Sequence, residues 1–362
     1  MKIGLIGFGF MGKAFAHSLS SINHYYKKYI PNVEIAGVVT SSFKSSKKID
    51  LKKYNINRAY IDIDHLLENE DIGSIYIATP NTLHHEQLLA AIEANKNILC
   101  DKPLAINPEE SKRIIKSQRP NMIYQMMFEY RNFPAIREIK YLIENKKIGD
   151  LINFKASYLH GSYLDIERPM SWRLEEGGGS VSDLAPHIID LCNFLVGDIT
   201  MIKGFKRNII SKRPKNKNSK LFEKVVVDDY AACLCKTQDG ITGMLDVSRV
   251  SMGSIDELTL TINGTKGTLK WNLEELNFYQ HLTDEGAKKI FAVNDFHNLT
   301  DFPPGKVSNG WLRAHTHSVY QYISRVGNIK LPEKELEYIP SFEDGHKVQS
   351  SLNLFTDYNS YF

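Results

Sequence analysis

A carboxylate and an imidazole lie four residues apart in a glycine-rich stretch of this chain. Three glycines, 177–179, precede Asp183 and His187, and the apolar run 188–196 that follows predicts a helix. An imidazole with an ordinary pKa of about 6.5 takes up or releases a proton at neutral pH, and a neighbouring carboxylate can orient it. The pattern therefore indicates acid–base chemistry. The alternatives are that Asp183 is only the N-cap of the helix and that His187 is structural.

A candidate catalytic lysine stands earlier in the chain. Lys102 belongs to the Asp-Lys-Pro run 101–103, directly after the apolar segment 98–100. A lysine on a loop is usually just solvated, whereas one held at a sheet edge beside a bound substrate can polarise a hydroxyl or a carbonyl. We take Lys102 as a candidate for this second role.

Three glycines near the N-terminus have the spacing of a dinucleotide-binding loop. They follow the apolar run 3–6 and open a predicted helix, which is the context that this motif requires. The first glycine would allow a tight turn, the second a close approach to a pyrophosphate, and the third close packing of helix on strand. The alternative is a glycine-rich turn in another kind of α/β protein. The cofactor-binding residues predicted here are Gly7, Gly9, Phe10, Met11 and Gly12.

The end of the second predicted strand, 33–39, bears on the choice of cofactor. No Asp or Glu stands there to accept hydrogen bonds from a ribose 2′-hydroxyl. Thr40 and Ser41 follow the strand with Lys44 nearby, and hydroxyls with a cation suit a 2′-phosphate better. We therefore expect NADP(H) to be favoured over NAD(H). The alternative is that the lysine only solvates a loop.

A further polar turn follows the predicted strand 74–78. Thr79, Pro80 and Asn81 stand at the carboxyl end of this strand, the edge at which doubly wound sheets bind ligands. Asn81 can also cap the next helix, and the two roles are compatible. We expect all three residues to line the cofactor crevice.

The order of elements in the first third of the chain indicates a doubly wound parallel sheet. Strands are predicted at 3–6, 33–39, 74–78, 97–100 and 122–126, and helices at 13–29, 64–69, 84–94 and 108–117. Strand–helix alternation with short connections is typical of this fold. At 362 residues the chain is also long for one core. We therefore expect an N-terminal Rossmann domain over 1–128 and a C-terminal α+β domain over 129–362.

The composition is that of a soluble globular protein without a bulk excess of charge. The chain has 45 basic and 42 acidic residues and a net charge of +3, so nothing favours nucleic acid as a partner. The basic stretches 44–53 and 203–224 are expected to be solvated loops. The four cysteines have no metal-binding spacing, and we expect no metal. Cys233 and Cys235 are predicted on one face of a strand.

The sequence also bears on location. No apolar run approaches the roughly 18 residues that a membrane span needs. The opening residues 1–6 lead into glycines rather than into a signal peptide. We therefore expect a cytoplasmic protein that does not associate with a membrane.

Taken together and in this order, the motifs resemble the Gfo/Idh/MocA family, named after glucose–fructose oxidoreductase, inositol dehydrogenase and rhizopine catabolism. The residues that carry the resemblance are 78–81 with His84, 101–103, 130–131, 134–136, 148–149, 171–173, 177–187 and 340–345. The family fold implies a Rossmann domain followed by a domain with a large, mostly antiparallel open sheet. The runs 151–159, 224–236, 241–250 and 257–263 alternate as such strands would, and a turn is expected at Asn263 and Gly264.

The resemblance implies roles for particular residues. In the family, the lysine of a Glu-Lys-Pro loop, an Asp and a His form the catalytic group, and here these are Lys102, Asp183 and His187. The loop begins with Asp101 where most relatives have Glu, and the shorter carboxylate changes how the lysine can be oriented. The resemblance also places His84, Asp101 and Lys102 at the cofactor. Relatives commonly pair through the open sheet face, so a homodimer or homotetramer is implied.

The expected reaction is the reversible oxidation of a secondary alcohol on a sugar, sugar derivative or cyclitol. The expected substrate contacts are Lys102, Tyr130, Tyr163, Trp172, Arg173, Asp183 and His187, with His315 as a weaker candidate. Each aromatic residue could instead pack in the core. Two alternative functions occur in the family, an NAD-dependent glycosidase and a non-catalytic dinucleotide-sensing regulator. The proposed catalytic group argues against the regulator, and the missing acid after the second strand argues against a tightly held NAD.

Overall fold

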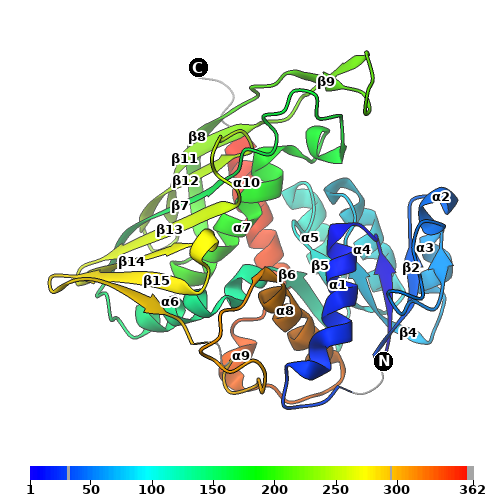
Figure 1. Cartoon of the computed structure of the whole chain (residues 1–362), viewed down its shortest axis with the longest axis horizontal. Helices are drawn as coiled ribbons and strands as arrows, with labels where there is room; N and C mark the ends of the chain where they lie inside the picture. The colour runs from blue at the N-terminus through cyan, green and yellow to red at the C-terminus, as the bar shows by residue number, and fades with distance from the viewer. Residues whose placement is uncertain (31–32, 294–295, 357–362) are drawn as a thin grey trace. The chain divides into compact units, whose positions relative to one another are not determined.

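The chain forms two compact units in the computed structural model, which describes residues 1–30, 33–293 and 296–356 (Figure 1). The first unit comprises residues 1–105, 109–132 and 293–346. The second comprises residues 106–108, 133–292 and 347–356. A segment that follows the second unit's strands in sequence is therefore grouped with the N-terminal residues.

A six-stranded parallel sheet forms the centre of the first unit. Its order is β3 (Ala59–Tyr60), β2 (Glu34–Val39), β1 (Lys2–Ile6), β4 (Ile72–Ile77), β5 (Asn97–Asp101) and β6 (Tyr124–Met127). The strands are nearly continuous apolar runs because helices cover both faces of such a sheet. The predicted doubly wound Rossmann sheet is confirmed. The strand order reverses between β1 and β4, and ligands bind at the carboxyl ends of the strands beside such a point.

The helices of the first unit differ from prediction mainly at their ends. They are α1 (Phe10–Ser21), α2 (Phe43–Ser46), α3 (Ile63–Leu67), α4 (His84–Glu93) and α5 (Pro108–Ser117). The predicted helix 13–29 begins earlier, at Phe10, and stops at Ser21, where a 3-10 turn (Ile22–His24) follows. Ser, Asn and His in this region are weak helix formers, which accounts for the early end.

A helix from late in the chain, α8 (Trp311–Val326), packs against α1. The Ser18 hydroxyl lies 2.9 Å from Nδ1 of His315 and 3.0 Å from the hydroxyl of Thr316. His315 is fully buried, and burial lowers its pKa to about 3. Packing between the two helices thus accounts for this histidine, the weaker of the substrate candidates.

An eight-stranded sheet dominates the second unit and is mostly antiparallel, as predicted (Figure 1). Its order is β16 (Gly286–Phe291), β15 (Phe278–Thr283), β14 (Gly267–Asn272), β13 (Glu257–Gly264), β7 (Leu151–Leu159), β12 (Thr242–Ser248), β11 (Tyr230–Thr237) and β8 (Ile199–Arg207). Only β7 and β12 pair in parallel. The turn expected at Asn263 and Gly264 lies two residues later, at Thr265 and Lys266, because Gly264 still pairs with Gly267.

Two helices, α6 (Pro134–Glu144) and α7 (Gly179–Leu195), belong to the same unit, and α7 lies against β7, β11 and β12. The sheet face toward α7 is buried, and Cys233 and Cys235 lie on it as predicted. On the strands β8, β11 and β12 the opposite face carries the exposed side chains of Met201, Leu234 and Met244.

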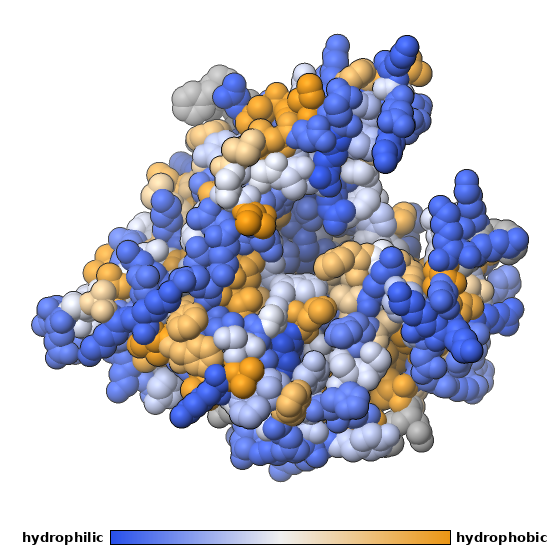
Figure 2. Space-filling model, in the orientation of Figure 1, coloured by the Kyte–Doolittle hydropathy of each residue, from blue (hydrophilic) through white to orange (hydrophobic). Residues whose placement is uncertain are grey.

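The second basic stretch, 203–224, is not a loop, contrary to expectation. It runs along β8 and then through the hairpin of β9 (Lys212–Pro214) and β10 (Phe222–Lys224). Strand alternation explains Lys203, which is exposed on the same face of β8 as Met201, whereas Lys206 lies on the other face and is half-buried. In the view of Figure 2 hydrophilic side chains cover most of the surface, and apolar ones gather between the positions of β8 and β9. Among the described residues, no helix is long and apolar enough to cross a bilayer.

Candidate functional site

The glycine loop of the first unit has the geometry of a phosphate cradle. Gly7 has a φ of +96°, and a Cβ there would stand 2.4 Å from the Ala78 carbonyl oxygen. A Cβ on Gly12 would stand 2.6 Å from the Gly7 carbonyl, so both positions require glycine. A Cβ on Gly9 would meet nothing within 4 Å. The space beside Gly9 is therefore open, at the point where the motif brings backbone toward a pyrophosphate.

The N-terminus of α1 suits an anion. Gly9 is the N-cap and supplies no side-chain acceptor, and the first turn contains no acidic residue. The first N–H groups of a helix have no acceptor within it and carry the positive end of the helix dipole. Phe10, the first helical residue, is 72% exposed, and its ring lies 5.6 Å from that of Trp311. The residues present thus fit the pyrophosphate of a dinucleotide.

The end of β2 leaves polar groups at the surface. Thr40 is buried, and its hydroxyl donates to the Ser42 carbonyl at 3.1 Å. Ser41 and Lys44 are exposed. The Ser42 hydroxyl lies 2.9 Å from that of Ser45, which holds the turn into the short helix α2. The polar turn here has hydroxyls and a cation at its surface.

His84 joins two of the predicted cofactor loops. Its Nδ1 lies 2.7 Å from the Pro103 carbonyl, and its Nε2 lies 3.0 Å from the Thr79 carbonyl. The imidazole is fully buried, and burial lowers its pKa. Asn81 is buried beside it at the start of a 3-10 turn, Asn81–Leu83. His84 therefore fixes the loop after β4 relative to the loop that carries Lys102.

Asp101, at the end of β5, directs the first residue of the lysine loop. Its Oδ1 accepts the backbone N–H of Lys102 at 2.8 Å, and its Oδ2 accepts the Tyr76 hydroxyl at 3.4 Å. The carboxylate is buried, whereas Lys102 is half-buried. Asp101 thus holds the backbone of Lys102 rather than standing free in solvent.

In the second unit, α7 begins earlier than the apolar run predicted. Gly179 has a φ of +92°, and a Cβ on Gly178 would stand 2.3 Å from the Arg173 carbonyl oxygen. The Asp228 carboxylate accepts hydrogen bonds from the Ser180 hydroxyl and, at 2.8 Å, from the Val181 N–H. Asp228 therefore occupies the N-terminus of α7. The alternative in which Asp183 is the N-cap is wrong, because Asp183 lies within the helix.

Two arginines hold Asp183. Nη2 of Arg249 donates to Oδ2 of Asp183 at 2.9 Å, and Nε of Arg173 donates to the same oxygen at 3.2 Å. Arg249 is fully buried, and its Nη1 also donates to the Arg173 carbonyl at 2.9 Å. A charge removed from water needs such partners. The carboxylate is thereby fixed one helical turn before His187.

His187 is nine-tenths buried on α7. The ring of Tyr158 meets it edge-on at 5.6 Å, and the Tyr158 hydroxyl donates to Asp256 at 2.7 Å. Another histidine, His160, lies in the same region, 2.9 Å from the Ser162 hydroxyl. Burial and the charge of Arg249 lower the pKa of His160, against the opposing effect of Asp183.

The other predicted substrate residues differ in how far they are accessible. Tyr163 is buried, with the guanidinium groups of Arg168 and Arg249 at 4.0 and 4.7 Å from its ring centre. Tyr130 of the first unit is buried as well. Trp172 and Arg173 are half-exposed, and the Arg173 cation lies 4.3 Å from the Trp172 ring. Of the aromatic candidates, Trp172 is the one with accessible surface.

Three residues that lie beside the candidate site residues could not be identified from the sequence. Arg249 follows β12 and contacts Asp183, but an isolated arginine after a strand belongs to no recognisable motif. His160 follows β7 without a spacing that would mark it. Glu129 stands at the start of a 3-10 turn, Glu129–Asn132, and is 3% exposed. The signal for Glu129 is an acidic residue two positions after an apolar strand.

The Rossmann fold, the loops at the carboxyl edge of its sheet and the side chains around Asp183 together define an oxidoreductase with a dinucleotide-binding domain. The profile of an oxidoreductase family with an NAD-binding Rossmann fold matches residues 1–125, and that of the GFO/IDH/MocA C-terminal domain matches residues 136–270. The chain belongs to the Gfo/Idh/MocA family of oxidoreductases. It is a dehydrogenase or reductase.

Named relatives match nearly the whole chain. Levoglucosan dehydrogenase of Pseudarthrobacter phenanthrenivorans is 27% identical over 96% of this chain and 93% of that protein. Glucose-6-phosphate 3-dehydrogenase of Bacillus subtilis is 25% identical over 99% of this chain and 96% of that protein. The structure of a levoglucosan dehydrogenase with NADH and L-sorbose has a TM-score of 0.89 at 25% identity, covering 99% of this chain and 96% of the other.

Two glycine substitutions separate folding from cofactor binding. Gly7→Ala should lower the free energy of unfolding by at least about 1–3 kcal/mol, since it combines a positive φ with a backbone overlap. Gly9→Ala should leave the melting temperature nearly unchanged, because its Cβ enters open space, yet weaken dinucleotide binding in that same space. Thermal melting and fluorescence titration with NADPH and NADH measure the two effects. Equal dinucleotide affinity in Gly9→Ala and the wild type would remove this loop from the cofactor site.

Proposed function

We propose that this protein transfers a hydride between a nicotinamide cofactor and a secondary alcohol or ketone of a sugar, sugar derivative or cyclitol. The observation that carries the proposal is the arrangement on α7, where two arginines hold Asp183 one turn before His187. The names of the relatives support the substrate class, since levoglucosan and glucose 6-phosphate are both sugars. The nicotinamide, when bound, supplies the hydride chemistry.

Each of the three catalytic candidates has a role suited to its chemistry. His187 accepts the proton of the substrate hydroxyl as general base and returns it in the reverse reaction. Lys102 donates a hydrogen bond to the same oxygen and stabilises the negative charge that develops there. Asp183, fixed by Arg173 and Arg249, orients the substrate or the imidazole. Trp172 offers an accessible aromatic face to a polyhydroxylated ring.

Removing either proton-handling group should slow the chemical step. We expect Lys102→Met and His187→Ala each to lower kcat by about 10²–10⁴-fold while dinucleotide affinity stays nearly the same. The measurement is turnover on a panel of sugars, cyclitols and sugar nucleotides, beside fluorescence titration with NADPH and NADH. Lys116→Met and His65→Ala, both at exposed positions, are the matched controls. Wild-type turnover in either active-site variant on the true substrate would exclude that residue from the mechanism.

We propose that the cofactor is NADP(H) in preference to NAD(H). The turn after β2 supports this, because Ser41 and Lys44 are exposed and no acid stands there to bind a ribose diol. The related levoglucosan dehydrogenase structure contains NADH, so the preference rests on this chain's own residues. The proposed contacts elsewhere are those of the glycine loop, of Thr79, Pro80 and Asn81, and of the loop of Lys102.

A carboxylate in the turn after β2 should reverse the preference. Ser41→Asp would repel a 2′-phosphate and accept hydrogen bonds from a ribose 2′-hydroxyl. We expect the ratio of NADPH to NADH affinity to fall by at least about tenfold, a change of about 1.4 kcal/mol. Ser20→Asp, at an exposed position on α1, is the control. A ratio that does not move would mean that this turn does not contact the 2′ position.

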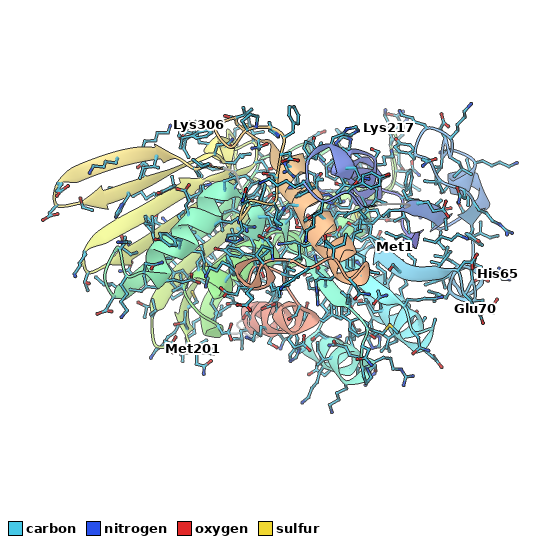
Figure 3. The ribbon with its side chains drawn as sticks, turned by 90° about the horizontal axis from the view of Figure 1, so that it is seen from below. Met1, His65, Glu70, Met201, Lys217 and Lys306 are labelled. Carbon is cyan, nitrogen blue, oxygen red and sulfur yellow. The ribbon has the colours of Figure 1, made fainter. Side chains whose placement is uncertain are left out.

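We propose that the protein forms a homo-oligomer through the sheet face opposite α7. Leu234 on β11 pairs directly with Met244 on β12, and their exposed fractions are 62% and 51%. Met201 and Phe205, on the edge strand β8, are about half exposed, and Met201 is labelled in Figure 3. Apolar side chains gathered on one sheet face are typical of an interface.

A charge at the centre of this face should weaken the oligomer. Leu234→Lys would place a cation opposite Met244 and beside Lys203, to which Leu234 is also paired. We expect a shift toward the monomer in light scattering after size exclusion. Leu336→Lys changes an exposed leucine on α9 (Glu333–Leu336) of the first unit and should leave the oligomer intact. An unaltered mass in the Leu234 variant would place the interface elsewhere.

A further inference from the structure

Glu129 is a buried carboxyl group in the first unit that the mechanism above does not use. Residues Asp101 and Met127 are paired on the adjacent parallel strands β5 and β6. Lys102 is the residue after Asp101, and Glu129 stands two residues beyond Met127. Both therefore emerge at the same carboxyl edge of the sheet, where Glu129 is 3% exposed.

Ionisation of Glu129 would place a second negative charge beside that of Asp101 in a buried place. Burial and a neighbouring like charge both disfavour the ionised form of a carboxyl group, so Glu129 keeps its proton. Burial, and then the charge of Asp101, raise the pKa of Glu129 to about 8, against the smaller opposing effects of Lys102 and of a hydrogen bond from Trp311.

We propose, on the basis of the function above, that Glu129 is a positioning residue that acts through Lys102 by keeping its proton. While Glu129 is neutral, it adds no negative charge beside Lys102. When Glu129 loses its proton, the new anion attracts the ammonium and opposes the negative charge that develops on that oxygen. Turnover therefore falls as Glu129 ionises.

Two further titratable groups of the sheet, on β4 and β5, stay neutral in this pH range. Tyr76 on β4 and Cys100 on β5 are fully buried, and burial together with nearby acids raises the pKa of each well above its ordinary value. Both stay neutral around pH 8. Asp101 is held as the acceptor of the Lys102 N–H and of the Tyr76 hydroxyl. Trp311, the partner on α8, does not titrate.

The substitution Glu129→Gln tests the proposal because an amide resembles the protonated acid but cannot ionise. In alcohol oxidation the wild type should lose about tenfold in kcat between about pH 7 and about pH 9, as the protonated fraction falls. The glutamine variant should lose much less over the same interval. Glu93→Gln, an exposed position on α4, is the matched control and should follow the wild type.

The thermal stability gives a readout that does not depend on turnover. Between about pH 4.5 and about pH 8 the folded protein retains a proton on Glu129 that the unfolded chain has lost. The wild type is therefore destabilised as the pH rises through this window, and Glu129→Gln lacks that contribution. We expect the melting temperature of the variant to rise relative to the wild type across the window. The difference for Glu93→Gln should stay constant.

Two results would overturn the proposal. A relative melting temperature of Glu129→Gln that is independent of pH would mean that Glu129 does not keep its proton. An equal loss of turnover at every pH, with an unchanged profile, would mean a purely structural role. A pH-dependent difference in melting temperature with full turnover in Lys102→Met would instead contradict the proposed function, because Glu129 would be protonated beside a lysine that catalysis does not need.

Discussion

The burial of a single guanidinium group organises the candidate site of the second unit. Arg249 is completely withdrawn from solvent and must therefore find acceptors inside the protein. It finds them in the Asp183 carboxylate and the Arg173 carbonyl, and it also lies against the ring of Tyr163. One buried cation thus fixes the carboxylate on α7 and the turn that carries Trp172 and Arg173. The first unit has a related arrangement, in which Asp101 holds the backbone of Lys102.

The two glycine-rich stretches of the chain open helices in physically different ways. At α7 the close approach of Gly178 to the Arg173 carbonyl and of Gly179 to Asp228 brings a carboxylate onto the helix N-terminus. That anion-binding end is already occupied by the protein itself. At α1 the space beside Gly9 stays open and no acid stands in the first turn. Similar glycine patterns therefore serve packing in one unit and leave a helix N-terminus suited to an anion in the other.

Much of the fold could be predicted because its signals are local. An apolar run ended by glycines located β1, an apolar run located β2, and period-two alternation located β7 to its exact ends, Leu151–Leu159. The ends of the helices followed less directly from the sequence, because α1 stops at Ser21 among weak helix formers and α7 begins at Gly179, where Asp228 accepts the Val181 N–H. The basic stretch 203–224 was misjudged because charge alone does not distinguish an exposed strand from a loop.

The sequence by itself determined the order of the strands along the chain, the glycine loop, and the candidates Lys102, Asp183 and His187. These features depend on residue type and on spacing within a few positions. Only the tertiary structure decided which charged groups are buried next to one another. Arg249 meets Asp183 across 66 positions of the chain, and Glu129 comes near Lys102 through the pairing of neighbouring strands. Whether a carboxyl group keeps its proton depends on burial and on neighbouring charges, and both arise only when the chain has folded.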